Sequence, residues 1–178
     1  MPQAVTHIFI VIILLDLYRD YFVKDKRNFP LHYILIGGIA GLLPDIDVII
    51  YYILSFFGYG FGQIHRTFTH TLFFPLFFIV LAIPFLNFKN RKLSERHLKL
   101  RNIFLVIAFG CFVHLILDAL VAGVIMPFYP ISSAGLGLNL INLFPLAWQG
   151  TIEPVLDGVI LVLWLISLEY RKRLQSLG

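Results

Sequence analysis

The sequence predicts an all-α membrane protein with about five transmembrane helices, in a single polytopic domain covering residues 1–178. Two observations predict this class. Hydrophobic residues make up 59% of the chain and charged residues only 13%, whereas soluble domains contain roughly 45–50% and about 25%. The apolar residues also form runs close to the roughly 20 residues that a helix needs to cross the hydrocarbon layer. A soluble domain of this size could not bury so much apolar surface.

Five apolar segments have the length of a membrane-spanning helix. They lie at roughly 3–22, 31–57, 67–87, 101–122 and 153–170. In the second segment, Pro44 lacks an N–H group and disfavours helix at Leu43, so we expect a kink or break there. Gly37 and Gly41 form a small-xxx-small step, which is typical of close helix packing. Residues 123–152 are apolar but rich in Gly, Pro and Asn, and predict a re-entrant or surface-hugging loop.

The basic residues predict the orientation. Thirteen of the fourteen Lys and Arg residues follow the first segment, lie between the third and fourth, or follow the fifth. With five crossings these three regions fall on one side, which the positive-inside rule makes cytoplasmic. We therefore expect a multi-pass protein of the inner (plasma) membrane with its N-terminus outside and its C-terminus in the cytoplasm. The net charge of +4 then reflects topology, and we expect membrane lipids rather than nucleic acid as partners; the sequence does not indicate the oligomeric state.

Ionisable side chains interrupt the apolar segments, where they are costly and point to function. They are His7, Asp45, Asp47, His65, His70, His114 and Asp118. His114 and Asp118 are four residues apart, so they share a helix face and suit either two ligands of one metal or a simple hydrogen bond. His65 and His70 can converge only if the third helix begins between them, with Thr67 or Thr69 capping its first turn. Asp45 and Asp47 can converge only at a break near Pro44.

The expected topology places these side chains at similar depths in the outer half of the membrane. Aspartates with no nearby lysine or arginine in the spans need a counter-charge, and a metal cation supplies one. Four histidines and three aspartates exceed the needs of one tetrahedral ion, so the number fits two ions. Imidazole and carboxylate without thiolate favour zinc, with manganese or iron as alternatives; the single Cys111 gives neither a disulfide nor a cysteine metal site.

Two further residues are catalytic candidates. Arg66 is the one basic residue on the outer side, and its forked donors suit a substrate phosphate or, alternatively, a lipid headgroup. Glu153 could act as a general acid or base. Glu153 and Asp157 could equally be carboxylates that complement the dipole at the start of the fifth helix.

The polar motifs resemble those of the YdjM-like inner-membrane proteins, a family described as metal-dependent hydrolases. The resemblance rests on His7, LLPDID at 42–47, HRTFTHT at 65–71 and HLILD at 114–118. AGVIMPFYP at 122–130 and Glu153 fit more loosely. The resemblance implies a helical membrane protein with metal ligands drawn from Asp45, Asp47, His65, His70, His114 and Asp118. The short segment FGYGFGQ before His65 departs from members with longer insertions, so the resemblance does not transfer a substrate preference.

The leading functional hypothesis is a membrane-embedded, metal-dependent hydrolase. It would use a metal-activated water to cleave an ester or phosphoester of a lipid or lipid-linked substrate. One alternative is a metal-ion or proton transporter that uses the same His/Asp cluster as a relay. A second alternative is a non-catalytic scaffold in which a metal ion only links the helices.

Overall fold

The computed structural model describes residues 4–86 and 99–176, with helices as the regular elements of these two stretches. The α-helices are α1 (Ala4–Phe22), α2 (Leu31–Ala40), α3 (Ile46–Ser55), α4 (Phe61–Ile64), α5 (Phe73–Ala82), α7 (Leu100–Leu117) and α8 (Leu146–Ser176). Short turns are η1 (Lys26–Asn28), η2 (Ile83–Phe85), the π-helical η3 (Asp118–Ala122) and η4 (Leu140–Leu143). The all-α prediction is confirmed for this part of the chain. The basic residues at 89–96 lie outside it.

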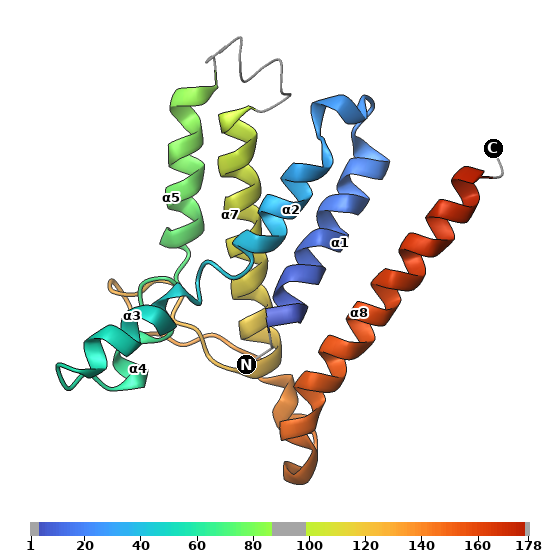
Figure 1. Cartoon of the computed structure of the whole chain (residues 1–178). Helices are drawn as coiled ribbons and strands as arrows, with labels where there is room; N and C mark the ends of the chain where they lie inside the picture. The colour runs from blue at the N-terminus through green and yellow to red at the C-terminus, as the bar shows by residue number, and fades with distance from the viewer. Residues whose placement is uncertain (1–3, 87–98, 177–178) are drawn as a thin grey trace.

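The helices form a bundle in which α7 is central (Figure 1). Helix α7 packs against α5 on one side and α2 on the other, and α1 packs against both α2 and α7. Helix α8 contacts α1 and slants away from the bundle, while α3 and α4 project from the end where α1 begins. The ends of α1 and α8 and the start of α7 lie at the opposite end (Figure 1).

The core lies between α1, α2 and α7. Buried residues of α1 recur about every four positions, as expected for one helix face, and include Val11 and Leu15. They pack with Tyr33 of α2 and Val106 of α7. At the centre of this contact Gly110 allows two backbones to meet, because a Cβ at Gly110 would collide with the carbonyl oxygen of Gly37. The predicted small-residue packing on α2 is confirmed, and its partner is a third glycine on α7.

Two described helices are long and apolar enough to cross a membrane: Leu100–Val121, which is α7 with most of η3, and Leu146–Tyr170 in α8. The apolar helices Leu31–Ala40, Ile46–Ser55 and Phe73–Phe85 are shorter. The expected break at Pro44 is confirmed, since α2 ends at Ala40 and α3 begins at Ile46. Helix α3 then leaves the bundle (Figure 1), so residues 31–57 are two separate helices and not one kinked span.

Two helices differ from their predicted bounds. Helix α5 begins at Phe73 rather than near residue 67, and its N-cap, Leu72, makes no side-chain cap bond. The prediction that Thr67 or Thr69 caps this helix is therefore wrong. Helix α8 begins at Leu146, seven residues before the expected start, and contains Pro154. Gly150 and Pro154 indicate a loop by propensity, but proline removes only one helical hydrogen bond, which a long helix can tolerate.

Candidate metal centre

Histidine and aspartate side chains meet at the end of the bundle where α1 begins and α7 ends. They come from four segments: the start of α1, the α2–α3 turn, the stretch between α4 and α5, and the end of α7 with the start of η3. The structure brings together all seven residues that the sequence predicts as ligands: His7, Asp45, Asp47, His65, His70, His114 and Asp118. All are buried except Asp45, whose side chain is 25% exposed.

Backbone breaks in two segments produce this convergence. Because α2 stops before Pro44, Asp45 lies just before the first turn of α3 and Asp47 lies within it. Arg66 has a φ of 62°, in the left-handed region that non-glycine residues seldom adopt. This reversal allows the rings of His65 and His70 to approach, with centroids 5.0 Å apart. The expectation that the third helix begins between these histidines is wrong, because α5 begins at Phe73 and both histidines lie before it.

Four ligand atoms form the centre of the cluster: His70 Nε2, His114 Nε2, Asp45 Oδ1 and Asp118 Oδ2. The two nitrogens lie 3.1 Å apart. His70 Nε2 is 3.5 Å from each of the two aspartate oxygens, and His114 Nε2 is 3.6 Å from Asp45 Oδ1 and 3.9 Å from Asp118 Oδ2. Tetrahedral ligands at zinc distances are about 3.3–3.4 Å from one another. His70, His114 and Asp118 are therefore spaced as ligands of a single small divalent ion, and Asp45 lies close enough to each of the two histidines to share an ion with either.

Hydrogen bonds fix the orientation of both central rings. The Nδ1–H of His114 donates to the Gly41 carbonyl oxygen at 2.7 Å, because a carbonyl oxygen can only accept. His70 Nδ1 lies 3.2 Å from Asp47 Oδ2 and 3.1 Å from Thr69 Oγ1. Since the Thr69 hydroxyl donates to Asp47, His70 Nδ1 must also donate. In neutral imidazoles each Nε2 then carries a lone pair, and two facing lone pairs 3.1 Å apart repel unless a metal ion, or a proton on one ring, lies between them.

Both carboxylate oxygens of Asp47 contact neighbouring polar groups. Its Oδ1 lies 2.9 Å from His65 Nδ1, and its Oδ2 accepts from the Arg66 backbone N–H at 3.1 Å and from the Thr69 hydroxyl at 2.9 Å. Asp47 belongs to none of the three groups of ligand atoms that lie close enough to share an ion. Its geometry is that of a carboxylate that orients histidines. Sequence reasoning missed Thr69 and the Gly41 carbonyl as partners of the rings, since neither position carries a metal-ligand signature.

Buried atoms without hydrogen-bond partners lie within and beside this central set. They are His7 Nδ1 and Nε2, Asp45 Oδ1, His65 Nε2, and both oxygens of Asp118. Buried polar atoms normally have partners, so this concentration indicates a ligand. His7 forms a group of possible ligands with Asp45 and His114, and His65 forms another with Asp45 and His70. Because Asp45 belongs to both groups, the geometry has room for a second ion that shares a carboxylate with the first.

Arg66 lies against the cluster. Its Nη2 is 3.1 Å from Asp118 Oδ2, and its side chain is 18% exposed. Gly123 provides the room for the guanidinium, since a Cβ there would collide with Arg66 Nη1. Arg66 therefore balances part of the negative charge of the cluster and holds Asp118 in place.

An irregular segment after η3 packs beside the site, where the sequence predicts a re-entrant or surface-hugging loop. Ile125 and Leu136 pair through two backbone hydrogen bonds of 3.0 and 2.8 Å. The segment is joined to its surroundings where Leu72 N–H donates to the Pro127 carbonyl and Leu138 N–H donates to the Ala119 carbonyl. These bonds satisfy backbone groups of the segment within the protein.

The sequence predicts Asp157 and Glu153 at the start of the last helix, but both lie inside α8. Asp157 is buried and accepts hydrogen bonds from the backbone N–H and the hydroxyl of Thr6 in the first turn of α1. The dipole interpretation of Asp157 is wrong, because α8 begins at Leu146 and Asp157 lies well inside it. Asp157 instead caps α1, one residue before His7. Glu153 lies one turn earlier on α8 and belongs to none of the three ligand groups, so its general acid/base role stays a prediction.

Comparison with known proteins identifies the family. The profile of the YdjM inner membrane protein family matches residues 1–174, nearly the whole chain, and the chain belongs to this family. No curated protein and no solved structure matches the chain. The family establishes an inner membrane protein, in agreement with the composition and with the two long apolar helices. The resemblance drawn from the sequence motifs is confirmed.

Proposed function

We propose that this YdjM family member is a membrane-embedded, metal-dependent hydrolase that cleaves an ester or phosphoester of a lipid or lipid-linked substrate. The observation that carries the proposal is the approach of His70 Nε2 and His114 Nε2 to 3.1 Å between Asp45 and Asp118, in a buried place. Two imidazoles and two carboxylates without thiolate suit zinc, with manganese or iron as alternatives.

His70, His114, Asp45 and Asp118 would hold the ion, and His7 and His65 would hold a second ion or orient the first set. A divalent ion there supplies Lewis acidity, which polarises a carbonyl or phosphoryl group and lowers the pKa of water. Asp47 keeps the rings of His65 and His70 in place. Arg66 Nε has no hydrogen-bond partner, and its N–H could donate to a substrate phosphate. Glu153 is the candidate for proton exchange with the substrate.

An apolar groove supports a substrate with an alkyl chain. The groove lies between α5 and α7, has a volume of about 450 Å³, and is lined by apolar side chains such as Leu72, Pro75 and Phe112. Leu72 is two residues from His70, and Phe112 is two residues from His114. A lipid with its head at the metal centre could therefore place a chain in this groove without leaving the apolar phase.

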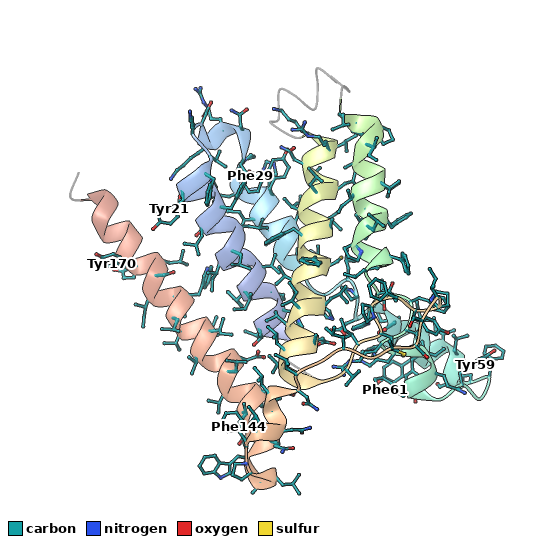
Figure 2. The ribbon with its side chains drawn as sticks, turned by 180° about the vertical axis from the view of Figure 1, so that it is seen from behind. Tyr21, Phe29, Tyr59, Phe61, Phe144 and Tyr170 are labelled. Atoms are coloured by element: carbon teal, nitrogen blue, oxygen red, sulfur yellow. The ribbon has the colours of Figure 1, made fainter. Side chains whose placement is uncertain are left out.

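The helix arrangement supports five passes through the membrane. The chain runs along the bundle in alternating directions through α1, α2, α5, α7 and α8, and the turn that follows α1 and the start of α7 lie at the same end as the last turn of α8 (Figure 1). Tyr21 and Tyr170 lie toward this end, and Tyr59 lies near the other (Figure 2), as tyrosines at two membrane interfaces would. The basic end is then cytoplasmic, and the metal centre faces the outer half of the membrane.

The transporter alternative needs a polar path from the cluster to the cytoplasmic side. The described core on that side of the cluster is apolar, with Val11, Leu15, Ile34 and Val106 buried between the helices. This observation favours hydrolysis over transport.

Metal content and turnover test the proposal. Protein purified in detergent should contain one or two divalent ions per chain and hydrolyse phospholipid carboxyl esters or phosphoesters. His114→Ala and Asp118→Asn should lose both properties, while His32→Gln, at the cytoplasmic end, should retain both. A metal-free wild type, with turnover unchanged in the two ligand variants, would sink the proposal. Stoichiometric metal without turnover of either substrate class would favour the scaffold, and pH-coupled metal flux in vesicles would favour the transporter.

A further inference from the structure

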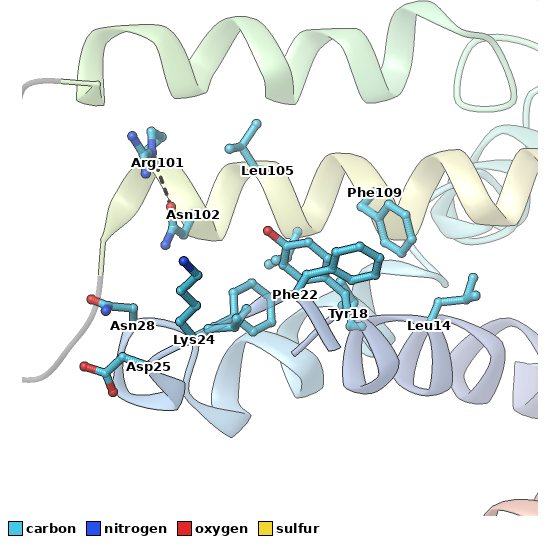
Figure 3. Close-up of a pocket in the computed structure, with 14 residues that line it drawn as sticks. Leu14, Tyr18, Phe22, Lys24, Asp25, Asn28, Arg101, Asn102, Leu105 and Phe109 are labelled. Atoms are coloured by element: carbon cyan, nitrogen blue, oxygen red, sulfur yellow. Dashed lines mark hydrogen bonds between the residues drawn. The ribbon is translucent and has the colours of Figure 1, made fainter. Parts of the chain in front are cut away.

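A second cavity lies at the opposite end of the bundle from the metal centre. It opens between α1, the turn that follows it, and α7, with a volume of about 800 Å³. Its lining separates by chemistry along the helix axes (Figure 3). Leu14 and Phe109 lie at one end, and Lys24, Asn28, Arg101 and Asn102 gather at the other.

The polar end carries two cations from different elements. Lys24 extends from the turn after α1 toward Asn102, and Arg101 lies beyond Asn102 in the same view (Figure 3). The Arg101 Nε–H donates to Asn102 Oδ1 at 3.2 Å, which orients the guanidinium. Among the described residues of the lining the one acid is Asp25, whose Oδ1 accepts from the Arg27 backbone N–H at 3.0 Å and from Arg27 Nε–H at 3.3 Å. Arg27 therefore offsets this carboxylate, and the net charge of the rim favours an anion.

The apolar part extends into the membrane. Arg101 and Phe109 are eight residues apart on α7, which corresponds to about 12 Å along the helix. Leu14, Tyr18 and Leu105 line the cavity and are 40%, 49% and 42% exposed. An apolar cavity that continues inward from a basic rim has the shape and chemistry of a site for a charged headgroup followed by an acyl chain.

We propose that this cavity binds an anionic phospholipid of the cytoplasmic leaflet, with its phosphate between Lys24 and Arg101 and one acyl chain between α1 and α7. A zwitterionic lipid lacks the net negative charge that the two cations favour, and free phosphate leaves the apolar part unfilled. The site is separate from the metal centre, because Arg101 and His114 are thirteen residues apart on α7, about 20 Å along the helix. The lipid is therefore a bound partner and not the hydrolysed substrate.

Native mass spectrometry of the detergent-purified full chain tests the proposal with phosphatidylglycerol and phosphatidylcholine of identical acyl chains. The wild-type protein should bind phosphatidylglycerol more tightly than phosphatidylcholine. Lys24→Gln combined with Arg101→Gln should weaken this binding roughly 30-fold, because each basic residue contributes about 1 kcal/mol to the attraction of an anionic lipid. Lys26→Gln combined with Lys99→Gln removes the same charge from residues at this end that do not line the cavity, and should change binding little. Melting temperature and metal content, unchanged among the variants, show that the fold is intact.

Leu14→Trp distinguishes a lipid from a free phosphate, because it fills the apolar part and leaves both cations. It should weaken phosphatidylglycerol binding, and inorganic phosphate should not compete with the lipid at equal concentration. If the two lipids bind equally, or if the Lys24/Arg101 variant matches its control, the proposal is overturned. Full competition by phosphate together with unchanged binding by Leu14→Trp would also overturn it, in favour of a phosphate site. If the Lys24/Arg101 variant does not fold, the contribution of charge can be tested on the wild-type protein. Its preference for phosphatidylglycerol over phosphatidylcholine should then be lost at high salt.

Discussion

His70 and His114 direct their Nε2 atoms at each other across 3.1 Å, although 44 positions separate them in the sequence. Both Nδ1 atoms are donors, so the facing nitrogens both carry lone pairs. Two aspartate oxygens lie 3.5 Å from His70 Nε2 and add negative charge to the same place. A metal ion bound between these nitrogens and carboxylate oxygens would stabilise them, so we expect folding and metal binding to be coupled.

Added zinc should therefore stabilise the protein. Metal-free protein should melt at a lower temperature than the metal-loaded form, because an ion that binds only the folded state contributes about 2.7 kcal/mol at one hundred times its Kd. His114→Ala should abolish the zinc-dependent rise; in the metal-free protein it removes the repulsion but also leaves the Gly41 carbonyl without its donor. Differential scanning fluorimetry in detergent, with and without chelator, measures both effects. A chelator-insensitive melting temperature in the wild type would contradict the coupling.

Asp47→Asn should weaken metal binding without removing a ligand. The carboxylate holds His65 Nδ1 at 2.9 Å and lies 3.2 Å from His70 Nδ1. Loss of such an orienting partner typically costs 10–100-fold in metal affinity. Competition with a chromophoric chelator measures the affinity, and Asp20→Asn near the end of α1, at the opposite end of the bundle, is the control. Complete loss of metal would instead identify Asp47 as a ligand, and unchanged affinity would show that its bonds do not position the rings.

Gly110→Ala should destabilise the bundle by about 1–3 kcal/mol, the usual cost of overpacking. The new Cβ would meet the Gly37 carbonyl oxygen and also lie 3.0 Å from Gly41 N, so α2 and α7 would have to separate. Gly158→Ala is the matched control, because nothing lies within 4 Å of a Cβ there and alanine favours a helix. Thermal unfolding measures both. The Gly41 carbonyl binds His114, so the Gly110 variant should also lose metal affinity.

The sequence predicted the parts of the site that follow from local rules. Pro44 predicted the break that frees Asp45 and Asp47, and the four-residue spacing predicted that His114 and Asp118 share a helix face. Composition predicted the all-helical membrane class. Each of these conclusions depends on residues close in sequence, whose geometry is fixed by the backbone.

The remaining features depend on contacts between distant segments. The start of α5 at Phe73 could not be predicted from propensity, because Thr69 donates to Asp47, 22 residues away, instead of capping the helix. Likewise, only the packing of α8 beside α1 makes Asp157 a partner of Thr6. The division of roles between Asp45 and Asp47 is also a tertiary property, because it depends on which carboxylate faces His65.

Labelling of single cysteines tests the orientation in the membrane. In a Cys111→Ser background, Tyr59→Cys should react with an impermeant maleimide in intact cells, whereas Lys26→Cys should react only after lysis. Tyr59 is 50% exposed and lies near the end with the metal centre, while Lys26 is in the turn after α1. The reverse pattern would place the metal centre on the cytoplasmic side and overturn the proposed topology.

The bond between Asp157 and Thr6 should support the metal centre from outside it. Asp157→Ala leaves the Thr6 N–H in the first turn of α1 without its acceptor, and loss of a cap costs about 0.5–2 kcal/mol. A double-mutant cycle with Thr6→Val should give a coupling energy of about 0.5–3 kcal/mol, because the residues are in contact. Thr151→Ala, which removes an exposed hydroxyl elsewhere on α8, is the control.

Since His7 follows Thr6 and its Nε2 lies 3.5 Å from Asp118, Asp157→Ala should also weaken metal binding. Lower stability with unchanged metal affinity would show that the cap supports α1 but does not position His7.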